Sequence, residues 1–268
     1  MHKLLTSLVI LAVGLSLAGP AAADTREEKR VRDATEALNQ LLRIPEQSVP
    51  PSLLSRAYAV AVVPNVVKAA FGVGGRHGKG IIVVRQDDNT WSDPAFIALT
   101  GGGFGFQIGA QSTDIVLVFK SRRGVEGLSS GTLTLGADAS IAAGPVGRHS
   151  SAATDFQFRA EVYSYSRSRG LFAGVALEGT GVTMDRRANA AFYGSPDVTP
   201  EAIFAGSAGR APASAGEFVQ LLTAQTSRLP VDRRVASQTR EPAPRAPEQP
   251  ASVKTYGIPG PEEAEEGE

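Results

Sequence analysis

The chain has 268 residues, and its 27 lysines and arginines balance its 27 aspartates and glutamates, so that its formal net charge is zero. This balance gives no support for a nucleic-acid partner, which requires clustered positive charge. The absence of cysteine excludes disulfides, cysteine nucleophiles and cysteine metal ligands.

The N-terminal segment, Met1 to Ala23, has the pattern of a cleaved secretory signal peptide. Lys3 supplies a basic start, an apolar run extends from Leu4 to Ala18, and three alanines precede Asp24. The apolar run is shorter than the roughly 20 residues that a membrane-spanning helix needs. We therefore predict an exported protein that begins at Asp24 and is periplasmic or secreted, with peripheral membrane association as a further alternative.

Two N-terminal helices are predicted next. Apolar residues recur every three or four positions across 25–42 with charged residues between them, which indicates an amphipathic helix that Pro45 ends. Pro51 is a favoured first helical residue, and a second short helix is expected to run from it to Tyr58.

A third helix is predicted just before a glycine-rich stretch. The short apolar run 59–63 stops at Pro64, and Asn65 is a good N-cap for a helix over 66–71. The stretch GVGGRHGKG, residues 72–80, then reads as a loop.

This predicted loop does not match a nucleotide-binding P-loop. If Lys79 were the phosphate-binding lysine, the motif would require glycine and a hydroxyl residue where the chain has Val73 and Gly80. Two interpretations remain, a nest of backbone N–H groups that binds another anion and a plain turn.

From residue 81 the pattern changes to the alternation of strands. Seven runs are rich in β-branched, aromatic and small residues, and helical patterning returns only at 188–193, 200–204 and 215–224. This order predicts an α+β, mostly β, fold: an antiparallel β-sandwich or barrel with N-terminal amphipathic helices and short C-terminal helices. The strand runs are IIVVR, FIALT, GFGFQIGA, TDIVLVF, GTLTLGADASIAA, DFQFRAEVYSYS and LFAGVALEGTGVTM.

The last segment, residues 228–268, is predicted to be a disordered Pro-rich acidic tail. It contains seven prolines, and glutamates dominate its C-terminal end, EEAEEGE. Such a composition buries too little apolar surface to offset the entropy of ordering the chain. The folded domain is therefore expected to span residues 24–227.

Catalytic and metal-binding patterns receive little support. Residues 127–131 match G-x-S-x-G, but a strand-like pattern follows Ser129 where a serine hydrolase requires a helix. Only His77 and His149 remain after signal cleavage, and neither belongs to a metal-ligand spacing. We predict a non-enzymatic protein without catalytic residues, metal or cofactor.

The segment 65–79 is the first candidate binding site. It combines apolar residues at Val66, Val67 and Phe71 with a group of basic residues. The apolar residues can contact a lipid interface while the basic residues bind anionic headgroups, or the apolar residues can be core and the basic ones solvated. The basic residues are Lys68, Arg76, His77 and Lys79.

A second basic candidate lies in the run YSYSRSR. In a regular strand Tyr163, Tyr165, Arg167 and Arg169 share one face, where two arginines can hold a phosphate. The same arginines can instead form cross-strand salt bridges. The candidate partners for such bridges are Glu161, Glu178 and Asp185.

Several long blocks resemble one family. VVPNVVKAAFGVGGRHGKGIIVVR, DPAFIALTGGGFGFQIGAQSTDIVLVF, TLTLGADASIAAGPVGR and YSYSRSRGLFAGVALEGT with NAAFYG occur in consistent order. Across roughly 51–194 the chain resembles the SYLF family of lipid-binding domains, which includes a yeast actin-binding member. The signal peptide fits the exported bacterial members.

The resemblance implies a non-enzymatic domain. Eukaryotic relatives are associated with phosphoinositide membranes through a basic, amphipathic N-terminal region, and some with actin filaments. By position in the matching block, Lys68, Arg76 and Lys79 would carry lipid binding. For an exported chain the expected partner is an anionic phospholipid membrane, and actin is a partner only by analogy with the family. The alternative is an envelope structural or protein-interaction module, which binds an envelope protein and uses the tail as a flexible spacer.

Overall fold

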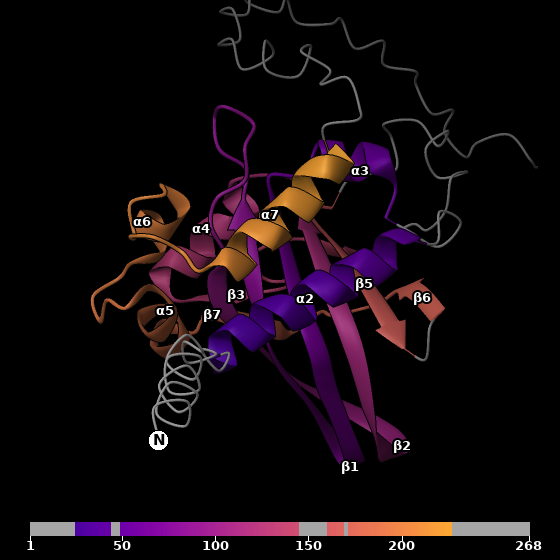
Figure 1. Ribbon diagram of the computed structural model, residues 1–268. Helices are drawn as coiled ribbons and strands as arrows, with labels where there is room; N and C mark the ends of the chain where they lie inside the picture. The colour runs from indigo at the N-terminus through magenta and orange to yellow at the C-terminus, as the bar shows by residue number, and fades with distance from the viewer. Residues whose placement is uncertain (1–24, 44–48, 145–159, 169–170, 227–268) are drawn as a thin grey trace, which may run out of the picture. The chain divides into compact units, whose positions relative to one another are not determined.

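The computed structural model describes residues 25–43, 49–144, 160–168 and 171–226 (Figure 1). The predicted signal peptide, the tail 228–268, His149 and Arg169 lie outside these ranges. The described helices are α2 (Arg26–Arg43), α3 (Pro51–Ser55), α4 (Arg123–Ser130), α5 (Arg186–Tyr193), α6 (Pro200–Phe204) and α7 (Ala213–Thr226). The described strands are β1 (Ala59–Val84), β2 (Ala95–Phe119), β3 (Thr132–Thr134), β4 (Ile141–Ala143), β5 (Val162–Ser168), β6 (Leu171–Gly174) and β7 (Thr180–Met184).

The helices follow from local signals in the sequence. At the start of α2, the Thr25 hydroxyl accepts from the Glu28 N–H at 3.1 Å, and the Glu28 carboxylate accepts from the Thr25 N–H at 2.8 Å. This reciprocal pair is a capping box. Helix α5 ends at Gly194, whose φ of 66° is the left-handed conformation that favours glycine. The predicted N-terminal amphipathic and short C-terminal helices are confirmed, as is the α+β, mostly β, class.

The predicted helix over 66–71 and the glycine loop after it are wrong, because both lie within the single strand β1. Asn65 does not cap a helix. It has a φ of 52° at a register shift between Val63 and Val66, and its N–H donates to Asp114 Oδ1 at 2.9 Å. Pro64 and Asn65 therefore form a bulge, and the strand continues through it. The extended backbone of 72–80 also excludes the nest geometry.

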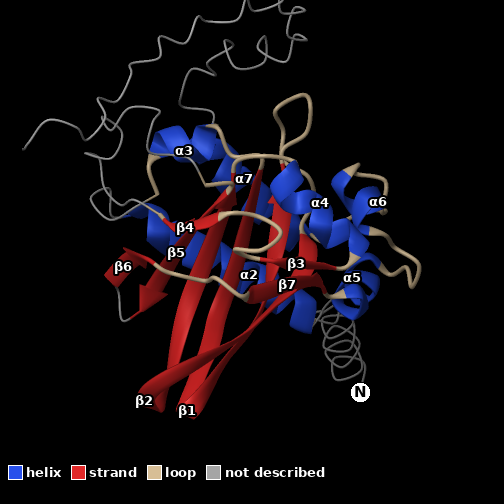
Figure 2. Cartoon of the chain, turned by 180° about the vertical axis from the view of Figure 1, so that it is seen from behind, coloured by secondary structure: helices blue, strands red, loops and turns tan. Residues whose placement is uncertain are grey.

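Strands β1 and β2 form one long antiparallel ribbon, which includes runs that the sequence predicted as separate strands. The register runs from Ala59↔Phe119 to Ile82↔Ala95. The other edge of β2 pairs with β7 near its start and with β5 near its end. The seven strands join in one curled sheet of order β3-β7-β2-β5-β4, with β1 on β2 and β6 on β5 (Figure 2). Among the described strands, only β4 and β5 pair in parallel.

The ribbon bends back on itself near its middle, so that two parts of β1 meet. A Cβ placed on Gly80 would lie 2.1 Å from the Val62 carbonyl oxygen, and one on Gly78 would lie 2.6 Å from Val66 Cγ2. A second register shift, between Ala70 and Gly72, marks the bend. In Figures 1 and 2 the middle of the ribbon extends beyond the helices at the lower end of the view.

Alternation along β1 sends successive side chains into two apolar cores. Val60 and Val62 pack in the core that α2, α3, α5 and α7 cover. Ala61 and Val63 pack in the core on the opposite face, which α4 and α6 cover. Figure 1 shows α2 and α7 side by side over the first of these cores.

Candidate functional site

The structure places two of the predicted basic residues, Lys68 and Arg76, on one face of the folded ribbon. Val66 and Gly78 face each other across the bend of β1, and Lys68 and Arg76 are each two positions nearer the tip. Because side chains two apart in a strand share a face, Lys68 and Arg76 lie on the same face of the folded ribbon.

Neither of these cations is neutralised by an ion pair within the described residues. Lys68 is exposed and stands opposite Gln111 in the register. Arg76 Nη1 donates to the Ala176 carbonyl oxygen at 3.3 Å, which leaves its charge uncompensated. The ribbon therefore presents two positive charges on one face, as an anion requires.

His77 and Lys79 belong to the opposite face of β1 and do not join this pair. His77 Nδ1 and Thr100 Oγ1 are 3.1 Å apart and share a hydrogen bond. Lys79 Nζ donates to Asp185 Oδ2 at 2.8 Å. Lys79 therefore already has a carboxylate partner inside the protein.

Asp185 is the centre of a structural junction. Its side chain is 11% exposed, caps α5 through the Ala188 N–H at 3.2 Å, and also pairs with Arg30 Nη1 of α2 at 3.5 Å. Burial raises the pKa of Asp185, but hydrogen bonds from Lys79 and Ala188 and the charges of Lys79 and Arg30 outweigh burial and lower this pKa below the ordinary value of an aspartate. The carboxylate thus links β1, α2 and α5.

Asp185→Asn should reduce the free energy of unfolding at neutral pH by about 1–2 kcal/mol. Asparagine retains the cap, so the substitution removes mainly the charge. A carboxylate whose pKa is lower in the folded state than in the unfolded state stabilises the fold at pH values above its unfolded-state pKa. This stabilisation is lost as the pH falls through its folded-state pKa. In urea unfolding, the gap between parent and variant should therefore shrink below about pH 4.

The matched control for this substitution is Asp33→Asn, which removes an exposed carboxylate 2.8 Å from Lys29 on α2. An exposed pair of this kind contributes at most about 1 kcal/mol. Equal effects of the two substitutions at neutral pH, or a gap at Asp185 that does not change with pH, would contradict the role given to the junction.

Arg167 forms a cross-strand salt bridge, which is one of the two roles that the sequence left open. Its partner is Asp114, which is not among the three predicted carboxylates. Its Nη1 lies 3.2 Å from Asp114 Oδ2, and the two residues are opposite each other in the β2–β5 register. Tyr163 and Tyr165, on the same face, are buried. Asp114 was missed because it lies 53 residues away in sequence.

The three predicted membrane-contacting apolar residues differ in their positions. Val66 is 2% exposed and belongs to the core under α4 and α6, so we correct its assignment from membrane contact to core. Val67 is 50% exposed, an unusual value for a large apolar side chain. The backbone of Phe71 lies in the middle of the ribbon.

Ser129 does not occupy a nucleophile elbow. It lies in the last turn of α4, and the strand β3 follows. A serine hydrolase requires the opposite order, in which a strand leads into the serine and a helix follows it. The described residues also contain no group of three or more histidines or carboxylates suited to a metal ion. None of the described helices has the length and apolar character needed to cross a membrane.

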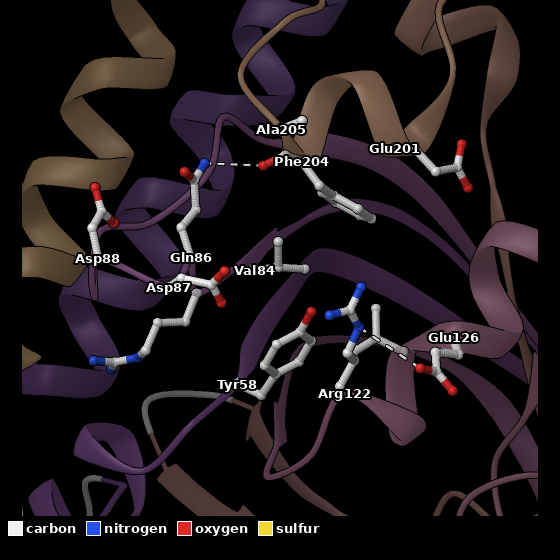
Figure 3. Close-up of a pocket in the computed structure, with 12 residues that line it drawn as sticks. Tyr58, Val84, Gln86, Asp87, Asp88, Arg122, Glu126, Glu201, Phe204 and Ala205 are labelled. Carbon is white, nitrogen blue, oxygen red and sulfur yellow. Dashed lines mark hydrogen bonds and ion pairs between the residues drawn. The ribbon is translucent and has the colours of Figure 1, made fainter. Parts of the chain in front are cut away.

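A pocket of about 550 Å³ lies between the β1–β2 turn, α4 and α6 (Figure 3). Gln86 Nε2 donates to the Phe204 carbonyl oxygen at 2.9 Å across it, and Arg122 Nε lies 3.7 Å from Glu126 Oε1. No pattern in the sequence indicates this pocket, because four segments that are distant in sequence build it. Its lining is Tyr58, Val84, Arg85, Gln86, Asp87, Asp88, Arg122, Val125, Glu126, Glu201, Phe204 and Ala205.

Comparisons with known proteins agree on one group of relatives. A family model described as "Ysc84: Las17-binding protein actin regulator" matches residues 100–225. The chain is 37% identical over 203 residues to Protein YSC84 of Saccharomyces cerevisiae, which is 75% of this chain and 42% of that protein. It is 35% identical over 206 residues to SH3 domain-containing YSC84-like protein 1 of Xenopus laevis, which is 74% of this chain and 61% of that protein.

LAS seventeen-binding protein 3 of Saccharomyces cerevisiae is 43% identical over 152 residues, which is 56% of this chain and 33% of that protein. The chain thus spans between a third and three fifths of the length of these three relatives.

Proposed function

Because the chain belongs to the Ysc84 family, also called SYLF, we propose that it is a non-enzymatic domain that binds the anionic phospholipid surface of a membrane. The observation that carries the proposal is the pair of uncompensated cations, Lys68 and Arg76, on one face of the folded ribbon. If the N-terminal segment up to Ala23 directs export, as we propose, the phospholipids of the cell envelope are the available anionic surface.

The surroundings of the pair support a lipid headgroup as the anion. Val67 is the neighbour of Lys68 in β1, on the opposite face of the strand, and exposes half of its apolar surface to solvent. Basic residues beside exposed apolar ones are typical of surfaces that bind in the interfacial region of a bilayer. Lys79 and Arg167, by contrast, are paired with Asp185 and Asp114, so we leave them out of the proposed headgroup contact.

Co-sedimentation of the mature chain 24–268 with liposomes tests the proposal. The chain should bind liposomes of mixed neutral and anionic lipid but not liposomes of neutral lipid alone. High salt should weaken binding, because added salt shortens the distance over which charges attract each other, which is about 8 Å at physiological ionic strength. A double variant, Lys68→Glu with Arg76→Glu, should bind anionic liposomes at least about tenfold more weakly, because each cation near such a surface contributes about 1 kcal/mol.

The matched control is Arg122→Glu with Arg123→Glu, which changes the net charge equally at two exposed positions before and in α4. This control should keep most of the binding. Equal losses in both double variants would show a general charge effect and would overturn the site. A parent chain that binds neither liposome set would overturn the proposed function itself.

Protein binding is the second candidate function. It is favoured by the names of the relatives, since the family model and LAS seventeen-binding protein 3 are both described by binding to Las17. Those proteins are longer than this chain, so the binding need not reside in the shared part. Failure of liposome binding together with a co-purified protein partner would favour this candidate.

A further inference from the structure

The pocket between the β1–β2 turn, α4 and α6 has no part in the proposed membrane site. Its volume of about 550 Å³ lies within the range of pockets that hold small organic molecules. Gln86 Nε2 donates to the Phe204 carbonyl oxygen at 2.9 Å, and this bond ties the turn to the last residue of α6. Two walls of the pocket are therefore held together by the protein itself.

One part of the lining is apolar and aromatic. Val84 and Val125 are buried and belong to the core under α4 and α6, so they form a firm apolar floor. Figure 3 shows the side chains of Tyr58 and Phe204 on either side of Val84, with the Tyr58 hydroxyl directed toward the middle of the pocket. This hydroxyl has no hydrogen-bond partner among the described residues. An apolar group of a ligand would therefore lie between two rings.

Two charged residues of the lining are already bound within the protein. Arg85 donates to two backbone carbonyl oxygens, of which that of Ala57 is the nearer at 2.9 Å. Its guanidinium also lies 4.5 Å from the centre of the Trp91 ring. Asp88 Oδ1 accepts from the N–H and the hydroxyl of Thr90, at 2.9 and 2.6 Å. Arg85 and Asp88 therefore stabilise the turn and its surroundings, and their hydrogen bonds are not available to a ligand.

Two groups of opposite charge remain available, on two different elements. The Asp87 carboxylate, in the β1–β2 turn, is exposed and has no partner among the described residues. The Arg122 guanidinium, just before α4, lies 3.7 Å from Glu126 Oε1, which is beyond hydrogen-bond distance. Its N–H groups thus donate to no atom in the described part of the chain. Figure 3 shows Asp87 and Arg122 on either side of Tyr58.

We propose that this pocket binds a small apolar zwitterion, namely an apolar amino acid or short peptide with a free amino and a free carboxyl group. The ligand's carboxylate accepts hydrogen bonds from Arg122, whose planar guanidinium matches a carboxylate. Its ammonium group donates to Asp87, and its apolar part lies between Tyr58 and Phe204. This inference goes beyond lipid binding and does not depend on it.

The charges of the lining disfavour a ligand with charge of one sign only. A purely anionic ligand would meet the carboxylates of Asp87, Glu126 and Glu201. A purely cationic ligand would leave the N–H groups of Arg122 without an acceptor and would place a second positive charge near them. Like charges placed together cost affinity. A ligand with one charge of each sign avoids both costs.

NMR titration of the isotope-labelled mature chain 24–268 tests the inference and locates the site. The probes are phenylalanine and the dipeptide leucyl-phenylalanine, each in the free form, the N-acetylated form and the C-terminal amide form. At least one free probe should shift the amide signals of residues 84–88, 122–126 and 201–205, and the tighter of the two shows which length of ligand fits. Its two blocked forms should bind at least about tenfold more weakly, because each has lost one charge-assisted contact.

Two substitutions separate the two contacts. Arg122→Gln should weaken binding of the free and acetylated probes but not of the amides, which have no carboxylate. Asp87→Asn should weaken binding of the free probes and the amides but not of the acetylated forms, which have no ammonium group. The matched controls, Arg123→Gln and Asp197→Asn, change exposed residues outside the lining and should leave every affinity unchanged.

Three results would overturn the inference. The first is that neither free probe shifts the signals of the lining. The second is that a blocked form binds as tightly as the free one. The third is that Arg122→Gln or Asp87→Asn weakens all three forms equally, which would show an effect on the shape of the pocket and not on one contact. None of these results bears on liposome binding, because Lys68 and Arg76 do not line the pocket.

Discussion

Gly80→Ala should reduce the free energy of unfolding by about 3 kcal/mol or more, or prevent folding. The added Cβ would lie 2.1 Å from the Val62 carbonyl oxygen and 2.7 Å from Val63 Cα. Both are backbone atoms that no change of rotamer can move, so the two parts of β1 would have to separate. That separation would open the core under α4 and α6, to which Val63 belongs.

Gly75→Ala is the matched control, since it makes the same chemical change in the same strand. The nearest atom to its added Cβ, the Gly101 carbonyl oxygen, lies 3.9 Å away, at ordinary contact distance. Alanine loses less backbone freedom on folding than glycine, so this variant should be as stable as the parent or slightly more so. Urea unfolding followed by circular dichroism gives both values, and equal values for the two variants would contradict the close approach within β1.

Asn189→Leu should reduce the free energy of unfolding by about 2–3 kcal/mol through a buried hydrogen bond. Asn189 of α5 is 2% exposed, and its Oδ1 accepts from the Phe96 N–H at 2.7 Å. Leucine has the same branched arrangement of side-chain heavy atoms but no acceptor, so the Phe96 N–H would be buried without a partner. The Phe96 carbonyl oxygen would keep its bond from the Asp185 N–H, at 2.9 Å.

Arg187→Leu introduces the same side chain at an exposed position of α5 and should change stability by less than about 0.5 kcal/mol. Hydrogen exchange at the Phe96 amide distinguishes a lost hydrogen bond from general loosening of the helix. The amide should exchange faster in Asn189→Leu than the change in global stability accounts for. Unchanged protection of this amide would refute the role assigned to Asn189.

The helices could be predicted from the sequence because their signals are local. The apolar period of 25–42, Pro51 at the start of α3 and Pro200 at the start of α6 all act within one or two helical turns. The same local reasoning failed at Pro64 and Asn65, where a proline followed by a capping residue looks like a helix start. Pairing with β2 decides the conformation there, and a partner strand that is distant in sequence leaves no local trace.

The glycines of 72–80 were misread for a related reason. Glycine is depleted in strands, so a glycine-rich stretch indicates a loop. Here Gly74 and Gly75 are paired with Gly103 and Gly102 across the ribbon, and Gly80 allows the close approach to Val62. The requirement for small residues comes from the fold-back of the ribbon, which no window of the sequence shows.

The candidate site could be predicted in its chemistry but not in its geometry. The sequence identified Lys68 and Arg76 as basic residues near apolar ones, and lipid binding by them stays a prediction. It did not show that Lys79 lies against Asp185, 106 residues later, or that Arg167 lies opposite Asp114. The pattern within one strand indicates the face on which a charge lies, but the fold decides whether a distant carboxylate neutralises it.

The continuous β1–β2 ribbon also affects how the chain can find its fold. Its ladder contacts begin at Ile82↔Ala95, beside the turn, where the partners are near each other in sequence, and they end at Ala59↔Phe119, where the partners are far apart. A hairpin with this pattern can form pair by pair, starting at the turn. Each pair that has formed shortens the loop that the next pair must close, which lowers the entropic cost of closing it. Local contacts made in this order favour rapid folding of a sheet, whereas β5 and β7 join from later parts of the chain. The longest strands in the described structure therefore carry a small kinetic cost for their length.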